Sequence, residues 1–61
     1  MYVVGDIVRL NSYVPNVSLH GCCAIIISHN PQSFYEYRIR FVHNSLEHME
    51  TSMRPHWIDK V

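Results

Sequence analysis

The residues best suited to chemistry lie close together at His20, Cys22, Cys23 and His29. Imidazole and thiolate groups bind zinc, and a cysteine beside a histidine is also the pairing used by cysteine nucleophiles. Adjacent residues in a strand point to opposite faces, so Cys22 and Cys23 cannot easily bind one ion together. The sequence has no second pair of cysteines to complete a zinc site. We therefore expect both thiols to pack as small apolar groups in a reduced cytosol, with no metal and no cofactor.

The size of the chain argues against an enzyme. A chain of 61 residues forms one domain at most. A domain this small leaves little room for a cleft of ligand size. It also buries only about 60% of the surface that its unfolded chain exposes, so its stability is marginal. We expect a single domain spanning residues 1–61 that is not an enzyme and takes no small-molecule substrate.

The composition indicates a folded protein without a strong charge. Apolar residues make up 48% of the chain and charged residues only 16%, which excludes a disordered tail. Five basic residues balance five acidic ones, whereas dedicated nucleic-acid-binding modules usually carry a basic excess. The longest apolar run, residues 22–27, is too short to cross a bilayer, and no basic segment leads into a long apolar one. We expect a cytoplasmic protein with no membrane segment.

Short apolar runs between turn residues predict an all-β chain. We expect strands at residues 7–10, 22–29, 34–42, 46–53 and 58–61. Residues 11–21 contain Asn, Ser, Pro and Gly and predict a long loop. Proline suits the first position of a helix, so residues 54–57 predict a single helical turn before the last strand.

Alternation of apolar and polar residues predicts which side chains face the core. It is clearest over residues 34–42. There we expect the inward side chains to be Tyr35, Tyr37, Ile39 and Phe41. The outward side chains are Glu36, Arg38 and Arg40, and Phe34 and Val42 lie at the two ends of this outward face. In the other strands we expect inward side chains at Val8, Leu10, Met49, Thr51, Met53, Ile58 and Val61. Residues 22–29 show no clean alternation, which fits a strand that is covered on both sides.

Four segments together resemble a known family. They are Gly5-Asp6-Ile7-Val8-Arg9-Leu10, Gly21 before the second strand, Tyr35-Glu36-Tyr37-Arg38-Ile39, and Pro55-His56-Trp57-Ile58. The chain resembles the small SH3-like barrels, including the KOW and Tudor branches, over nearly its whole length. The resemblance implies a five-stranded SH3-like barrel with a one-turn helix before the last strand. Proteins this short that begin Met-Tyr-x-Val-Gly-Asp also look like those carried by bacteriophages, which would place the chain in the host cytoplasm.

The chain has more apolar residues than so small a barrel can bury. Ile7, Phe34 and Val42 fall on faces that we assign to solvent, and Ile26 does not fit inside with the rest. An exposed apolar patch marks a protein interface, and open sheet edges favour self-association. We therefore predict a small protein-binding module, and in a phage a modulator or accessory virion protein, whose partner is another protein or a second copy of the chain. The predicted interface residues are Ile7, Ile26, Phe34, Val42, Tyr13 and Trp57.

The alternative is a nucleic-acid-binding barrel of the KOW kind. Its phosphate-contacting residues would be Arg9, Arg38, Arg40, Arg54 and Lys60, with Tyr13 or Trp57 stacking on bases. We expect the glutamates at positions 36, 47 and 50 to pair with these arginines across strands. Binding that weakens steeply with salt would distinguish this alternative from an apolar protein interface. A cage for a methylated cation and a pH switch through the five histidines are further hypotheses.

Overall fold

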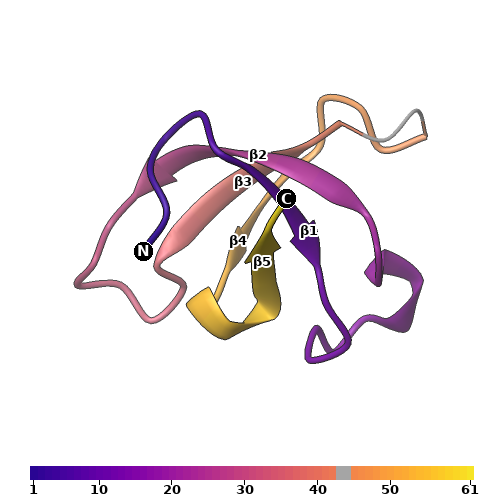
Figure 1. Ribbon diagram of the computed structural model, residues 1–61, viewed down its shortest axis with the longest axis horizontal. Helices are drawn as coiled ribbons and strands as arrows, with labels where there is room; N and C mark the ends of the chain where they lie inside the picture. Colours follow the sequence, from indigo (N-terminus) through magenta and orange to yellow (C-terminus); the bar gives the residue numbers. More distant parts are fainter. Residues whose placement is uncertain (43–44) are drawn as a thin grey trace.

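The computed structural model describes residues 1–42 and 45–61, and these ranges form one antiparallel sheet (Figure 1). Its strands are β1 (Ile7–Leu10), β2 (Cys23–His29), β3 (Tyr37–Phe41), β4 (Glu50–Met53) and β5 (Ile58–Lys60), in the spatial order β4-β3-β2-β1-β5. Two single-turn 3-10 helices, η1 (Val17–Leu19) and η2 (Pro55–Trp57), lie in the connections. The prediction of an all-β chain is confirmed. The described residues include no helix with the length and apolar character needed to cross a bilayer.

The sheet is strongly curled. β4 and β5 are its two edge strands, yet residues 54–57 alone connect them. In a flat sheet the edges would lie about 19 Å apart, and a link containing a 3-10 turn is too short for that distance. Figure 1 accordingly shows β2 and β3 arching over β4 and β5. Within the described ranges no ladder joins β4 to β5, so the curled sheet is not closed there.

The core fills the inside of the curl. Its buried residues are Val8, Leu10, Val14, Ala24, Ile26, Tyr37, Ile39, Phe41, Met53 and Ile58. The period-two prediction is confirmed in β1 and β3, where the inward residues are buried and Arg38 and Arg40 are exposed. The link from β4 to β5 begins after Met53 and ends before Ile58, and both side chains enter this same core. Curling is thus what allows one face of a small sheet to bury most of its apolar surface.

The N-terminal segment covers part of the core and of the β5 edge. The Tyr2 backbone N–H donates to Tyr37 Oη at 3.1 Å, and Tyr2 Oη donates to the Ile58 carbonyl at 2.8 Å. Burial raises the pKa of Tyr2, with a smaller effect in the same direction from the charge of Asp59. Gly5 turns the chain back into β1 with φ of 97°, a conformation that suits glycine. The buried Tyr37 hydroxyl therefore has a partner far away in the sequence.

Three inward predictions are wrong because the strands are shorter than expected. Tyr35, Met49 and Val61 are exposed, whereas we expected them in the core. β3 begins only at Tyr37, β4 begins only at Glu50, and β5 ends at Lys60. Residues outside a ladder do not continue its alternation of faces. Before β4 the chain also turns through His48, whose φ of 74° is incompatible with a strand. Residues 43 and 44, between the expected strands at 34–42 and 46–53, would form a turn by the same pattern, and they lie outside the described residues.

The exposed position predicted for Ile26 is also wrong. Its side chain is only 1% exposed and packs in the core. The register explains this, because Ile26 lies opposite buried Ile39, while Ile25 lies opposite exposed Arg40. Of these two isoleucines, Ile25 is therefore the one on the outer face. A run of three isoleucines carries no alternation, so the sequence could not fix which of them points inward.

Candidate functional site

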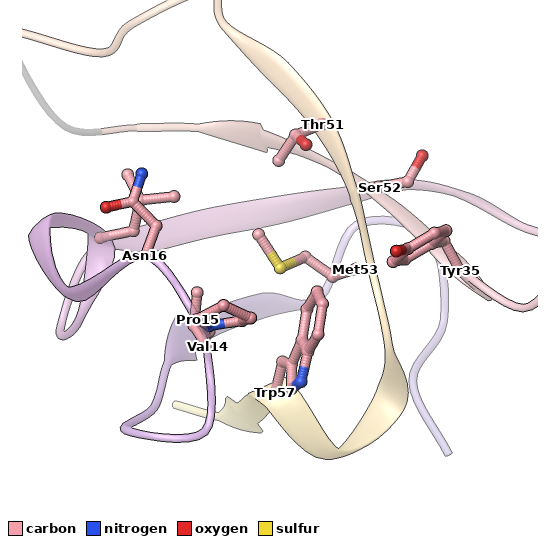
Figure 2. A pocket seen from close by; sticks show the side chains of 9 residues that line it. Val14, Pro15, Asn16, Tyr35, Thr51, Ser52, Met53 and Trp57 are labelled. Carbon is pink, nitrogen blue, oxygen red and sulfur yellow. The ribbon is translucent and has the colours of Figure 1, made fainter.

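A groove of about 400 Å³ opens beside β4, between η2 and the loop that joins β1 to β2 (Figure 2). In Figure 2 Met53 lies above Pro15 and Trp57, and Tyr35 lies on the far side of Trp57 from Pro15. Its lining comes from segments far apart in the sequence: Val14, Pro15, Asn16, Leu19, Tyr35, Thr51, Ser52, Met53 and Trp57. Most of these side chains are apolar or aromatic. The groove is thus suited to an apolar ligand and offers few groups for acid–base chemistry.

Trp57 is held in place by the turn that carries it. Pro55 occupies the first turn of η2, where its fixed φ favours the helical conformation. The Asn11 backbone N–H donates to the Trp57 carbonyl at 2.9 Å, and Asn11 Nδ2 donates to the His56 carbonyl at 2.9 Å. One side of the Trp57 ring packs against the core. Trp57 also lines the groove, so it connects the groove to the core.

The opposite wall is anchored as well. Val14 is buried in the core, so the loop cannot move away from the sheet without exposing it. His20 Nε2 lies 2.6 Å from the Val14 carbonyl oxygen, which requires that nitrogen to carry the proton. Asn16 caps η1 by accepting from the Ser18 backbone N–H at 3.1 Å. These contacts preorganise Pro15 and Asn16, which reduces the entropy lost when a ligand binds.

An aromatic surface continues from the groove in both directions. The Trp57 and Tyr35 rings are 5.9 Å apart, and Tyr35 contacts Phe34 edge to face at 4.9 Å. On the other side the rings of His56 and Tyr13 follow, each about 6 Å from the last. The structure thus brings together three predicted interface residues, Tyr13, Phe34 and Trp57. Tyr13 and Phe34 are exposed, so this surface is accessible to a partner.

β4 borders the groove with a free edge. The Phe41 N–H donates to the Met49 carbonyl at 3.0 Å, so these two residues form a hydrogen-bonded pair. Hydrogen-bonded and non-hydrogen-bonded pairs alternate along the antiparallel ladder between β3 and β4. By that alternation the backbone groups of Glu50 and Ser52 point away from β3. Within the described ranges, β4 pairs with β3 alone. An extended segment in the groove would therefore lie beside backbone donors and acceptors.

Ile7 and Val42 belong to a different surface. Both are exposed on the outer face of the sheet, where Ile7 lies opposite Ile25 and the Val42 N–H donates to the Cys23 carbonyl at 3.1 Å. The predicted interface residues are therefore divided between the groove and the outer face, with Ile26 in neither. Sequence reasoning missed the groove residues Val14, Pro15 and Met53. The available signal was the Val-Pro pair in the middle of the long loop.

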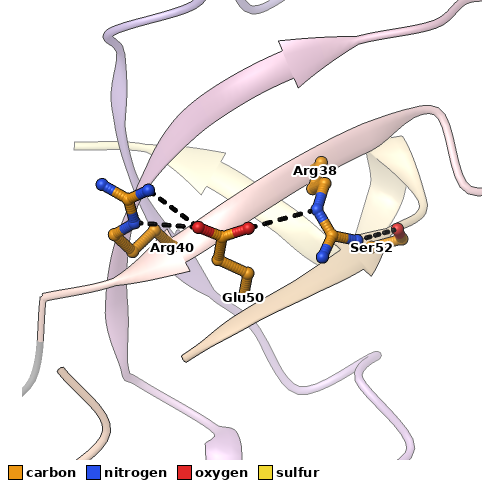
Figure 3. A network of polar contacts seen from close by, with 4 residues as sticks. All are labelled: Arg38, Arg40, Glu50 and Ser52. Carbon is orange, nitrogen blue, oxygen red and sulfur yellow. Dashed lines mark hydrogen bonds and ion pairs between the residues drawn. The ribbon is translucent and has the colours of Figure 1, made fainter. Parts of the chain in front are cut away.

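Two of the arginines in the nucleic-acid alternative are paired with one glutamate (Figure 3). Arg40 donates to Glu50 Oε2 through Nη2 at 2.7 Å and Nε at 3.1 Å, and Arg38 Nε lies 3.4 Å from Oε1. The predicted pairing is confirmed for Glu50. The prediction is wrong for Glu36, whose Oε2 lies 2.7 Å from His29 Nε2. Glu36 precedes the first residue of β3 and therefore lies beside His29, the last residue of β2.

The remaining charges follow a similar pattern. Glu47, expected to pair with an arginine, lies 3.8 Å from its exposed neighbour His48, because the chain turns there instead of extending. Lys60 lies 3.8 Å from Asp6, and Arg9 lies opposite Asp59 in the ladder of β1 and β5. Most of the cations considered for phosphate contact thus have an acidic neighbour, which reduces the positive potential of the outer face.

The arginines give a testable titration. The hydrogen bond from Arg40 is the main cause that lowers the pKa of Glu50 below its ordinary value, and partial desolvation opposes it. Because the folded pKa is lower than the unfolded one, ionised Glu50 stabilises the fold above the ordinary glutamate pKa. This contribution is lost as the pH falls through the lowered pKa. Replacing Arg40→Gln is expected to raise the pKa of Glu50, measured by NMR titration of its carboxyl carbon.

The matched control for this titration is Arg9→Gln. It removes an equally exposed arginine from the same outer face but does not contact Glu50. The pKa of Glu50 should remain low in that variant. An equal rise in both variants would mean that the overall charge of the face, and not the bond from Arg40, sets the titration.

The two cysteines are free thiols on different sides of the sheet. Cys22 packs against the core, and Cys23 lies opposite exposed Arg9 in the ladder. Among residues 1–42 and 45–61, no three His, Cys, Asp or Glu side chains gather in a way that could hold a metal ion. We therefore assign the chemically distinctive part of the surface to the aromatic groove.

No family model, curated protein or solved structure matches this chain. Its function must therefore be argued from its own surface.

Proposed function

We propose that the chain is a small, non-enzymatic protein-binding module whose groove takes an extended, proline-containing segment of another protein. The observation that carries this proposal is the Tyr35–Trp57 ring pair, which lines a groove of about 400 Å³ together with Pro15. Proline-rich segments dock into aromatic-lined grooves because the polyproline conformation is already extended and loses little entropy on binding. The free edge of β4 beside the groove also favours an extended ligand over a helical one.

The fold also supports the proposal of a small protein-binding module. The five strands, the long first loop and the turn η2 before β5 are the features on which the resemblance to SH3-like barrels rests. We propose that the curled sheet is a barrel of that kind, open between β4 and β5. In a phage, such a module would act in the host cytoplasm as a modulator or as an accessory virion protein. The outer-face residues Ile7, Ile25 and Val42 provide a second apolar surface for a further copy or another protein.

The nucleic-acid alternative has less support. Arg38 and Arg40 are engaged by Glu50, and contact with phosphates would require that pairing to be broken. Arg54 stacks on Phe34 at the far end of the aromatic surface, away from Arg9 and Lys60 in the ladder of β1 and β5. The five predicted cations therefore do not form one continuous stripe of unpaired charge.

Selection from a random peptide library tests the proposal. We expect the immobilised protein to enrich peptides with proline and apolar residues, and their affinity to change little between low and high salt. A mixed-sequence single-stranded DNA serves as the comparison ligand. Failure to enrich any peptide sequence would contradict the proposal, as would tighter binding to the DNA that falls steeply with salt.

A further inference from the structure

The position of Arg54 suggests what else the bound segment carries. We propose that Arg54 binds a carboxylate of the partner, so that the segment in the groove is acidic as well as proline-containing. This inference rests on the proposed function, because it names the partner chemistry of the same groove. It also assigns Arg54 to protein recognition and not to phosphate contact.

Arg54 does not itself line the groove, but it lies next to residues that connect to it. It directly follows Met53, which lines the groove, and its guanidinium carbon stands 4.0 Å from the centre of the Phe34 ring. Phe34 in turn contacts Tyr35, whose ring lines the groove. The cation is thus one aromatic ring away from the groove, within reach of the end of an extended segment.

Arg54 has no acidic partner within the described part of the protein, whereas every Asp and Glu side chain is engaged elsewhere. Asp6 lies near Lys60, Glu36 near His29, and Glu47 near His48. Glu50 pairs with both Arg38 and Arg40, and Asp59, opposite Arg9 in the ladder, accepts from Asn11 Nδ2 at 3.4 Å. These are the five carboxylate side chains of the chain, and residues 43 and 44 add none. The charge of Arg54 is therefore left for a group outside the chain.

The environment of Arg54 favours an anion over a neutral acceptor. The guanidinium lies over the Phe34 ring in a cation–π contact, which restricts the side chain before a ligand binds. Its Nε–H is buried without a hydrogen-bond acceptor in the described structure. A cation short of acceptors beside an apolar surface gains most from a charge-assisted hydrogen bond, and the Arg54 side chain is only partly buried.

Two synthetic decapeptides of repeated proline and leucine test the inference. They are identical except that both terminal residues are glutamate in one and glutamine in the other, and both are blocked at their ends. We expect the glutamate peptide to bind the protein about fivefold more tightly at low salt, and the preference to disappear at high salt. Affinity is measured from the fluorescence of Trp57, the one tryptophan of the chain.

Variants locate the preference. Arg54→Met keeps an apolar side chain against Phe34 and should bind both peptides equally. Arg9→Met, which removes an arginine on the outer face, should retain the full preference. A second variant, Arg54→Lys, keeps the charge but loses the planar stacking, and should retain part of the preference.

The possible failures are distinguishable. Equal binding of the two peptides to the unmodified protein would overturn the role of Arg54 and leave the proposed groove intact. A preference that survives in Arg54→Met would place the carboxylate at another cation and equally overturn the inference. Binding of neither peptide would overturn both the inference and the proposed function.

Discussion

Replacing Ile26→Thr is expected to lower the free energy of unfolding by about 2–4 kcal/mol, whereas Ile25→Thr should lower it by about 1 kcal/mol or less. Ile26 is buried in the core, so threonine there loses apolar contacts and buries a hydroxyl group. Ile25 is only partly buried on the outer face. A chain of 61 residues has a total stability of roughly 3–9 kcal/mol, so Ile26→Thr removes a large share of it.

The two substitutions control for each other. Both residues lie in β2, and both changes replace one β-branched side chain with another, so intrinsic strand propensity changes equally. Urea unfolding followed by Trp57 fluorescence measures the difference. A larger effect at Ile25 would mean that the register between β2 and β3 is shifted by one residue, and equal destabilisation would contradict the burial of Ile26 alone.

Loss of the Tyr35 ring is expected to weaken binding strongly without disturbing the fold. Aromatic residues at the centre of an interface commonly contribute 2 kcal/mol or more, so Tyr35→Ala should weaken binding of the glutamate decapeptide about thirtyfold. Tyr35 is 46% exposed, so its removal should change the stability of the fold little. Trp57→Ala should weaken binding at least as much, but it also removes a ring that packs against the core.

The matched control for Tyr35→Ala is Val42→Ala. Val42 is exposed to a similar degree but lies on the outer face, so the affinity should not change. Comparable losses in the two variants would assign the peptide to a site other than the groove. Urea unfolding of both variants confirms that any loss of affinity does not come from loss of the fold.

The parts of the fold that follow local alternation could be predicted from the sequence. In β1 and β3, charged residues alternate with apolar ones, so Val8 and Ile39 were correctly placed in the core. In β2 the run of isoleucines does not alternate with polar residues. Only the pairing with β3 decides whether Ile25 or Ile26 faces the core. The strands were predicted to be longer than they are. A turn such as the one through His48 depends on a backbone conformation that the composition does not specify.

The groove could not be predicted as a site because the curl of the sheet creates it. Pro15, Tyr35, Met53 and Trp57 come from four separate segments. They meet only because residues 54–57 draw the two edge strands together. Sequence reasoning identified Trp57 as a loop aromatic, but it placed Tyr35 in the core by continuing the alternation of β3 beyond its first residue. The pairing of Glu50 with arginines was predictable because it is a cross-strand contact within one ladder.

The most direct test of the groove is an NMR titration of the ¹⁵N-labelled protein with the glutamate decapeptide. We expect the largest shifts at the Trp57 indole N–H and at the backbone amides of Tyr35, Asn16 and Ser52, with the amide of Ile7 on the outer face unchanged. Shifts that centre on the outer face, or no shifts at a large excess of peptide, would contradict the account of this protein as a module that binds extended segments in its aromatic groove.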